Sequence, residues 1–372
     1  MHDYQVSVTN DRLEQLRLAS DLIMNDQSEE ANAVLEALLE TLPADDDITK
    51  LCASALKERN KVAVPMYLRD LDEDDKQINV FDLILQAVPS VEVTTSTALN
   101  TMLNLYSSGV TSFTHLNIGI GKGRFEMGLL QELAKADHDK IPRYIRIVGI
   151  DIDNASLRET GEEIQKIADE LLPDTTTVEY VPIFAFAEAI NSNTWERIMQ
   201  HNTDVLGVIS AFTLHHIPTQ EQRQSVIDHI AACDPHLFML IEPDSNHFTP
   251  NLTERLINCW NHFGTIFKLI DKQGLSKSEA RAIKYTFFGR EIEDILGNEE
   301  VKRSEKHERA ILWVNRIKKS GLSLLRLPKD YFAENVLAHD KFQMLSPDTD
   351  HKFVTTRYGN VPMVALDRKS VV

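Results

Sequence analysis

The sequence predicts an α/β fold with a parallel sheet, extended by helical segments. Beyond Thr114, short apolar runs alternate with helical patterns, and this alternation is typical of right-handed βαβ units. The N-terminal part of the chain and the stretch from Asp244 to Glu300 show helical spacing without strands. A chain of 372 residues has room for two or three units or for one elaborated domain.

The N-terminal part is predicted to be helical. Apolar residues recur at helical spacing over Asp11–Arg59, with breaks at Pro43 and at the acidic run Asp45–Asp47. Further helical patterns cover Val80–Val88 and Thr95–Tyr106. These segments precede the first strand, so they are expected to lie outside the βαβ region.

Five apolar runs predict the strands of the sheet. They are His115–Ile118, Ile145–Ile150, Thr177–Pro182, Val205–Ser210 and Leu237–Ile241. The helical stretch after the fifth run, including Leu252–Leu269, is predicted to be an insertion. The remaining elements expected are a helix over Glu305–Lys319, a strand near Leu322–Leu327 and a last strand at Val361–Leu366.

Composition excludes several classes of protein. A formal net charge of −18 repels nucleic acid, and no dense cluster of Lys and Arg counteracts it. The cysteines Cys52, Cys233 and Cys259 lack paired metal-ligand spacing, so they are predicted to be buried thiols and no metal site is predicted. Without a signal-like N-terminus or a run of about 20 apolar residues, we expect a soluble, cytoplasmic protein that does not bind membranes.

A glycine-rich turn follows the first predicted strand and predicts a nucleotide site. Gly119, Gly121 and Gly123 stand in the order Gly-x-Gly-x-Gly, where the backbone can come close to a ligand. The dinucleotide fingerprint has a third glycine where Arg124 stands. The spacing therefore favours S-adenosylmethionine over a nicotinamide dinucleotide. Asn117, before the turn, could accept a hydrogen bond from the ammonium group of this cofactor.

Two further positions support an adenosine site. Asp151 ends the second strand, where its carboxylate could accept both ribose hydroxyls; a helix N-cap is the alternative, although Asp153 is the more natural cap. Ser210 begins the loop after the fourth strand, which continues through Leu214, His215 and His216. That loop resembles the one that many class I methyltransferases place beside the methionine moiety and the methyl acceptor. Capping of the next helix is the alternative role for the two histidines.

Later residues give a resemblance that spans nearly the whole chain. The segment Phe287–Ile292 has the form FxGRE, and the motif RxExHExxxxWxxR continues from Arg303 to Arg316. With Glu242, Asn246–His247 and Val361–Met363 in order, the sequence resembles the GRAS family. Plant members of this family are transcriptional regulators that act through partner proteins. Bacterial members have been proposed to be small-molecule methyltransferases, and the intact glycine turn is more similar to this group.

The resemblance implies a Rossmann-like class I methyltransferase core with a helical cap. The core is expected to be a mostly parallel seven-stranded sheet with helices on both faces. The predicted segments are an N-terminal cap at 1–95, the first part of the core at 96–244, a cap insertion at 245–300 and the rest of the core at 301–372. The N-terminal helices and the insertion are predicted to pack together above the strand ends and to enclose a pocket.

The predicted function is methyl transfer from S-adenosylmethionine to oxygen or nitrogen of a small molecule. His216 or Glu291 would accept the proton, since the sulfonium is already activated and at most one general base is needed. Arg290 would anchor the substrate. The other residues predicted to bind substrate are His215, Glu242, Asn246 and Tyr285.

Two other functions stay open at this point, and so do some residue roles. One function is a non-catalytic module that binds a ligand or a partner protein, and the other is a nicotinamide-dependent oxidoreductase. Arg290, Glu291, Arg303 and Glu308 could instead form internal salt bridges between cap and core. A homodimer is possible.

Overall fold

The computed structural model describes most of the chain. The described residues are 2–59, 83–84, 87–200, 203–324, 342–345, 353–358 and 361–370. Two compact units form, each from separate stretches of sequence. We call the unit of Met1–Glu92, Asp244–Glu308 and Arg357–Met363 the helical unit, and the unit of Val93–Pro243, Arg309–Thr356 and Val364–Val372 the sheet unit.

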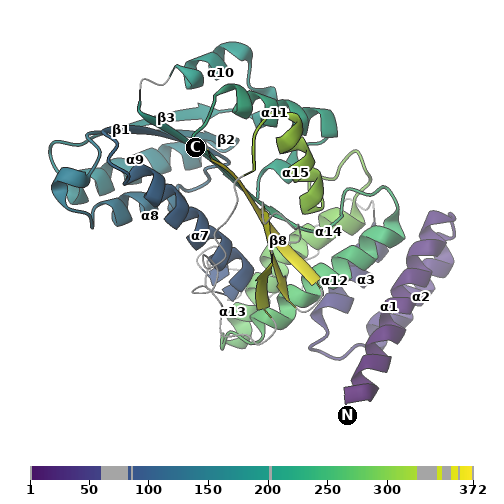
Figure 1. Cartoon of the computed structure of the whole chain (residues 1–372). Coiled ribbons are helices and arrows are strands. Elements are labelled where there is room, and N and C mark those ends of the chain that lie inside the picture. Colours follow the sequence, from purple (N-terminus) through teal and green to yellow (C-terminus); the bar gives the residue numbers. More distant parts are fainter. Residues whose placement is uncertain are drawn as a thin grey trace. The chain divides into compact units, whose positions relative to one another are not determined.

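An eight-stranded sheet, in the order β3-β2-β1-β4-β5-β8-β7-β6, is the centre of the sheet unit (Figure 1). Its first five strands are parallel, whereas β8 runs antiparallel to β5. The strands are β1 (Ser112–Ile118), β2 (Tyr144–Asp151), β3 (Thr177–Phe184), β4 (Val205–Ala211), β5 (Leu237–Pro243), β6 (Phe342–Leu345), β7 (Phe353–Tyr358) and β8 (Val361–Ser370). The predicted parallel α/β sheet is confirmed, but the described residues form eight strands rather than seven.

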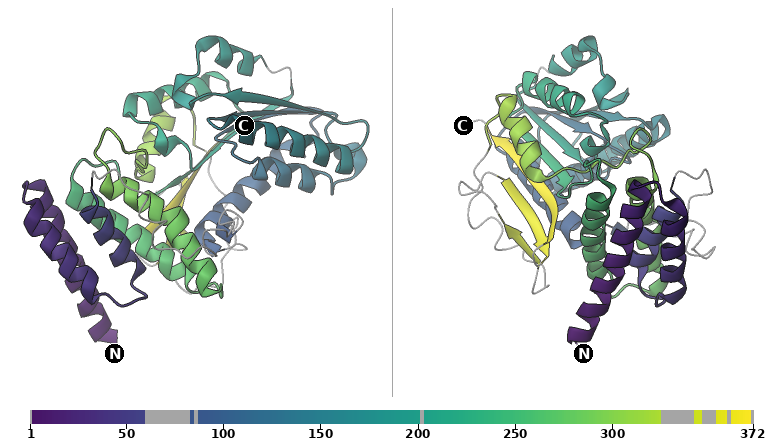
Figure 2. Two further views of the ribbon diagram at one scale, coloured as in Figure 1. Left: turned by 180° about the vertical axis from the view of Figure 1, so that it is seen from behind. Right: turned by 90° about the vertical axis from the view of Figure 1, so that its right-hand side faces the viewer.

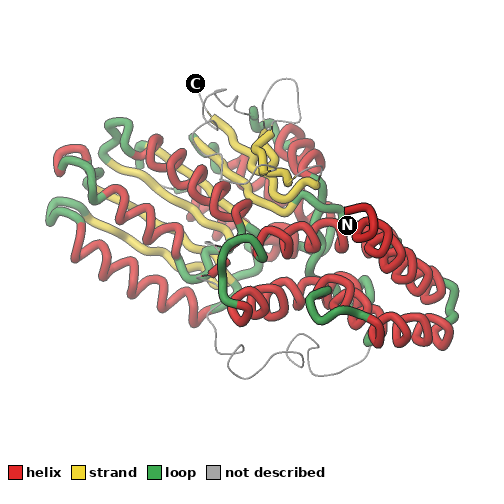
Figure 3. Tube along the Cα trace, turned by 90° about the horizontal axis from the view of Figure 1, so that it is seen from below, coloured by secondary structure: helices red, strands yellow, loops and turns green. Residues whose placement is uncertain are grey.

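Helices cover both faces of this sheet (Figures 1 and 3). They are α7 (Pro89–Tyr106), α8 (Arg124–Leu133), α9 (Asn154–Leu171), α10 (Ser192–Met199), α11 (Gln220–Ala232) and α15 (Ala310–Lys319). Leu116, Val148 and Leu206 face a buried core that includes Trp195 of α10 and Trp313 of α15. The opposite face packs against α7, α8 and α9. Because β1–β5 are parallel and are joined through helices, the carboxyl ends of these strands lie at the same edge of the sheet.

Among the described residues, the sheet unit also has three short 3₁₀ helices at loop positions. They are η1 (His138–Lys140), η2 (Ala187–Ala189) and η3 (Leu214–His216). The cap of α9 is Asp153, whose carboxylate accepts hydrogen bonds from the backbone N–H groups of Ala155 and Ser156. Asp151 is therefore not the N-cap of α9.

The helical unit brings the N-terminal helices and the insertion together (Figure 2). Its elements are α1 (His2–Met24), α2 (Ser28–Thr41), α3 (Asp47–Lys57), α12 (Leu252–Ile270), α13 (Lys277–Ala282), the π-helical η4 (Ile283–Gly289) and α14 (Arg290–Gly297). Ser20 of α1 lies 2.7 Å from the hydroxyl of Thr253 on α12. Arg59, just beyond α3, donates to the carbonyl oxygen of Leu296 on α14 at 2.6 Å. Contacts between distant parts of the sequence thus build this unit.

Two predicted elements differ from the structure. The helix expected from Glu305 begins at Ala310, because the preceding segment is irregular and the carbonyl oxygen of His307 accepts from the N–H groups of His247 and Phe248 instead of from a helical N–H. No strand occurs at residues 322–324, and the rest of that predicted strand lies outside the described residues, as does most of the predicted Val80–Val88 helix.

Candidate functional site

The three glycines of the turn all have positive φ angles, but their surroundings differ. A Cβ at Gly119 would lie 1.9 Å from Oγ1 of Thr213, and one at Gly123 would lie 2.4 Å from Cγ2 of Thr160. A Cβ at Gly121, where φ is +52°, would meet nothing within 4 Å. Packing therefore requires glycine at the two outer positions, whereas open space borders the middle one.

Asp151 ties the glycine turn to the end of β2. Its Oδ2 accepts a hydrogen bond from the backbone N–H of Gly121 at 2.8 Å, and its Oδ1 accepts from the N–H of Asp153 at 2.9 Å. The carboxylate is thus held by the protein's own backbone. Binding of a ribose by Asp151 stays a prediction.

Asn117 belongs to a buried polar chain that sequence reasoning missed. Its amide donates to Oε1 of Glu126 on α8 at 2.7 Å, and Nε2 of His115 lies 3.0 Å from the same oxygen. The hydroxyl of Tyr106 lies 2.9 Å from Nδ1 of His115. Burial, with the nearby Glu126 carboxylate, raises the pKa of Tyr106 well above its ordinary value. A glutamate at an inward position of α8 was the available sequence signal.

Ser210 also faces the protein's own backbone. It lies at the carboxyl end of β4, and its buried hydroxyl donates to the carbonyl oxygen of Ile118 at 3.0 Å. This bond joins the ends of β4 and β1. A contact from Ser210 to a cofactor stays a prediction.

Glu242, at the end of β5, binds the loop that carries His215 and His216. Its Oε1 accepts from the N–H groups of Thr213 and Leu214 at 3.2 and 2.7 Å. Its Oε2 lies 2.6 Å from Nδ1 of the buried His215, whose ring centroid is 4.1 Å from that of the exposed His216. The predicted substrate ligands His215 and Glu242 therefore contact each other.

In the helical unit, a second set of polar side chains gathers around two imidazoles. We call His247, Glu291, Glu305 and His307 the histidine–glutamate cluster. The Nδ1 atoms of the two histidines are 2.9 Å apart. Nε2 of His307 lies 3.3 Å from Oε2 of Glu305 and 4.0 Å from Oε2 of Glu291. Sequence reasoning proposed Glu291 but missed this grouping.

Burial determines the protonation of His247. Its pKa lies well below the ordinary value, first because burial penalises the charged ring and then because His307, His262 and Arg303 lie nearby. Nε2 of His247 is 3.0 Å from the hydroxyl of Ser245. His247 is therefore neutral near pH 7, and the hydrogen bonds on its two ring nitrogens fix its orientation.

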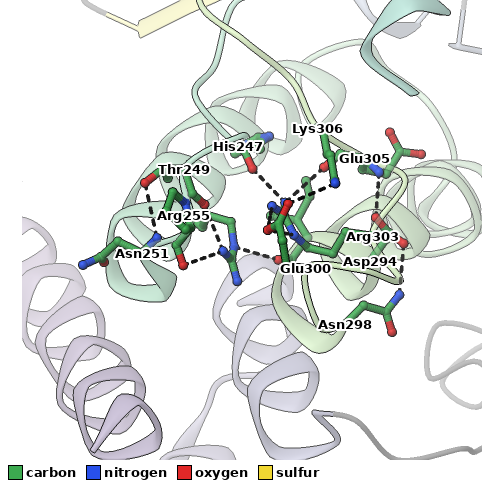
Figure 4. A network of polar contacts seen from close by, with 12 residues as sticks. His247, Thr249, Asn251, Arg255, Asp294, Asn298, Glu300, Arg303, Glu305 and Lys306 are labelled. Atoms are coloured by element: carbon green, nitrogen blue, oxygen red, sulfur yellow. Dashed lines mark hydrogen bonds and ion pairs between the residues drawn. The ribbon is translucent and has the colours of Figure 1, made fainter. Parts of the chain in front are cut away.

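The motif arginine Arg303 is an internal anchor (Figure 4). It donates to Glu300 and, at 2.7 Å, to the carbonyl oxygen of His247. Lys306 adds a second cation, 3.0 Å from Oε1 of Glu300. Nearby, Asp294 accepts from the N–H of Glu305 at 2.7 Å. These bonds hold the irregular segment before α15 in place.

The other residues predicted to bind substrate in the helical unit contact different partners. The amide of Asn246 donates to Glu254 at 3.1 Å, and the hydroxyl of Tyr285 donates to Asp47 of α3 at 3.1 Å. Arg290 is exposed, with its guanidinium carbon 5.9 Å from the centroid of the Phe287 ring. Each side chain thus has a partner within the helical unit, and the predicted pocket stays a prediction.

Comparison with known proteins decides the family. The GRAS domain family model matches residues 13–346. The chain belongs to the GRAS family. GRAS family protein RAD1 of Lotus japonicus is 25% identical over 252 residues, which cover 65% of this chain and 48% of the relative. DELLA protein RGA of Arabidopsis thaliana is 24% identical over 224 residues, which cover 59% of this chain and 37% of the relative.

A solved structure supports the same fold. The crystal structure of SCL7 in Oryza sativa covers 90% of this chain and 93% of its own, with a TM-score of 0.72 and 18% sequence identity. The chain spans about half the length of the first curated relatives that it matches. Among the described residues, no helix has both the length and the apolar composition needed to cross a bilayer.

These findings correct the predicted function. The relatives are plant GRAS and DELLA proteins, the regulatory branch of the family, so the prediction of a small-molecule methyltransferase is wrong. The prediction of a small-molecule substrate as the partner is wrong for the same reason. The catalytic roles given to His216 and Glu291 depended on that reaction and lose their basis with it. S-adenosylmethionine binding is a separate question and stays a prediction.

Proposed function

We propose that this GRAS protein is a non-catalytic regulatory module that acts by binding a partner protein. Its membership of the family, with plant GRAS and DELLA relatives, carries the proposal. The geometry of Glu242 adds support, because both carboxylate oxygens bind the protein's own loop. A carboxylate used in this way holds a loop in place and does not need a substrate.

Exposed apolar side chains at one end of the sheet support partner binding. Phe184 is 65% exposed, and Ile152 and Phe186 are each 58% exposed. Phe184 pairs in register with Asp151, which precedes Ile152, so the three residues lie at neighbouring strand ends. Large apolar side chains exposed together are typical of interaction surfaces. The net charge of −18 favours a partner with basic residues around its contact area.

The test begins with selection of binding partners from the proteome of the source organism. Each candidate would then be purified and measured by calorimetry against the wild type and Phe184→Asp/Phe186→Asp. We expect saturable binding that the double variant weakens at least about tenfold, because it places two charges in an apolar contact. Val301→Asp is the matched control, since Val301 is 88% exposed and belongs to the helical unit.

Two results would contradict the proposal. One is the absence of any saturable protein partner. The other is transfer of a labelled methyl group from S-adenosylmethionine to a small molecule in a cell extract, at a rate that requires the folded protein. If the double variant instead binds the partner with unchanged affinity, the surface at the strand ends is not part of the interface.

Non-catalytic binding of S-adenosylmethionine is a second candidate function. It is favoured by the open space beside Gly121 and by the strand order β3-β2-β1-β4-β5, which is that of doubly wound nucleotide-binding sheets. This order also supports a Rossmann-type core related to class I methyltransferases. Calorimetry with S-adenosylhomocysteine would test the binding. A cytoplasmic location stays a prediction.

A further inference from the structure

The histidine–glutamate cluster brings three potential metal-ligand atoms together. One nitrogen of His307 and one carboxylate oxygen each of Glu291 and Glu305 all lie within 4.8 Å of one another. Zinc binds imidazole nitrogen and carboxylate oxygen at about 2.0–2.2 Å, so two ligands at a tetrahedral angle lie about 3.4 Å apart. The distances from Nε2 of His307 to the two carboxylates, 3.3 and 4.0 Å, are close to this spacing.

Two elements supply these three atoms. Glu291 belongs to the first turn of α14, whereas Glu305 and His307 lie in the irregular segment before α15. Both of these side chains reach Glu291, since the three ligand atoms lie within 4.8 Å of one another. The N–H of Glu305 donates to the carboxylate of Asp294, and the N–H of His247 donates to the carbonyl oxygen of His307, so this segment is held by bonds that leave the three candidate ligand atoms unused.

A second layer of side chains orients His307. Nδ1 of His307 lies 2.9 Å from Nδ1 of His247, and Nε2 of His247 lies 3.0 Å from the hydroxyl of Ser245. When His247 has its proton on Nε2, it accepts the Nδ1–H of His307. Nε2 of His307, the ring nitrogen that lies near both carboxylates, is then the unprotonated one. A metal-ligating histidine commonly donates its other N–H to a hydrogen-bond acceptor, which here would be Nδ1 of His247.

Charge also favours a cation at this position. The imidazole of His307 is 1% exposed, and the side chains of Glu291 and Glu305 are 12% and 7% exposed, so an ion bound between them would be largely shielded from water. A divalent cation would offset the charge of both carboxylates.

We propose that Glu291, Glu305 and His307 bind one zinc ion, with a water molecule as the fourth ligand. The ion would link α14 to the irregular segment before α15, within the helical unit. Imidazole and carboxylate ligands suit zinc, whereas magnesium prefers oxygen ligands alone. This proposal goes beyond partner binding and does not depend on it.

Titration of the full chain tests the site. Protein treated with a chelator would be titrated with zinc chloride by calorimetry, in a competing chelator that suppresses weak surface sites. We expect one zinc ion per chain and a Kd at least about 100-fold weaker in Glu291→Gln, since loss of even an outer partner costs 10–100-fold. Glu293→Gln, also on α14 and half-buried, is the matched control and should bind like the wild type.

X-ray absorption of the zinc-loaded wild type gives a result that needs no variant. We expect scattering from one imidazole with oxygen as the remaining ligands. A sulfur shell at about 2.3 Å would assign zinc to cysteine and overturn the proposal. Absence of stoichiometric binding, or equal affinity in folded Glu291→Gln and wild type, would also overturn it. A tenfold excess of magnesium should leave the zinc affinity unchanged.

Discussion

The buried and partly buried carboxylates of the two units have different surroundings. In the sheet unit, Glu242 and Asp151 accept hydrogen bonds from backbone N–H groups at the strand ends. In the helical unit, Glu291 and Glu305 face the imidazole of His307. A carboxylate bonded to backbone fixes a loop, whereas carboxylates gathered around an imidazole offer a set of ligand atoms. Residue type alone therefore does not separate an internal support from a candidate binding site.

Removal of Glu242 should have the largest effect on stability. Glu242→Ala leaves the N–H groups of Thr213 and Leu214 and the ring of His215 without their acceptor in a buried place. We expect the free energy of unfolding to fall by about 3–5 kcal/mol. Urea denaturation measures this change, with the exposed Glu196→Ala as control. A loss below about 1 kcal/mol would show that the loop does not depend on this carboxylate.

Substitutions at Gly119 and Gly121 should lower the free energy of unfolding by different amounts. Gly119→Ala brings a methyl group against Thr213, whose hydroxyl is held by the carbonyl oxygen of Ala211 at 3.0 Å, while Gly121→Ala meets only strain from its positive φ. We expect losses of about 3 kcal/mol and about 1–2 kcal/mol, respectively. Thermal and urea unfolding of both variants would test the order, and equal losses would contradict the packing described for Gly119.

Asp151→Asn distinguishes a structural role of this carboxylate from a role in ligand binding. Loss of the charge weakens the hydrogen bonds from Gly121 and Asp153, so we expect a loss of about 1–2 kcal/mol in the free energy of unfolding. Asp174→Asn, at an exposed loop position, is the control. If stability is unchanged while affinity for S-adenosylhomocysteine falls, the ribose role predicted for Asp151 would be favoured.

Lys284 provides a third arrangement, in which a cation pairs with the carboxylates of Asp47 and Asp271. Burial alone would lower its pKa, but hydrogen bonds with Asp271 and Asp47 outweigh this and raise it above 10.5. The folded state holds this proton more tightly, so its stabilising effect is complete below about pH 10.5 and is lost as pH rises through the raised pKa.

The expected result is a pH-dependent difference between Lys284→Met and the wild type. The stability advantage of the wild type should shrink above pH 10.5, by at most about 1.4 kcal/mol per pH unit. Unfolding of both proteins between pH 8 and 12 measures it, with the exposed Lys268→Met as control. A constant difference over this range would show that Lys284 is not stabilised by its two carboxylates.

Arg290 should have the smallest effect on stability. It is exposed and lies over the ring of Phe287, so Arg290→Ala should change the free energy of unfolding by less than about 0.5 kcal/mol. The same variant should be measured against any partner protein that is found. Loss of stability greater than about 2 kcal/mol would place this motif arginine with Arg303 among the internal anchors.

The sequence by itself determined the parallel part of the sheet and the family. The runs from His115 to Ile241 predicted five parallel strands because buried strands need continuous apolar residues and their crossovers need helices. The FxGRE segment and the motif from Arg303 to Arg316 identified the family, since both depend on residue order alone.

Only the tertiary structure decided which polar residues meet. Glu126 and Asn117 are nine residues apart, but they touch because the glycine turn folds α8 back onto β1. Glu291, Glu305 and His307 converge because an irregular segment, predicted as helix, is held by hydrogen bonds from the backbone N–H groups of His247 and Phe248. The spacing of apolar residues along a segment indicates which face of that segment is buried. The partner of a polar side chain depends on long-range contacts, which no local pattern contains.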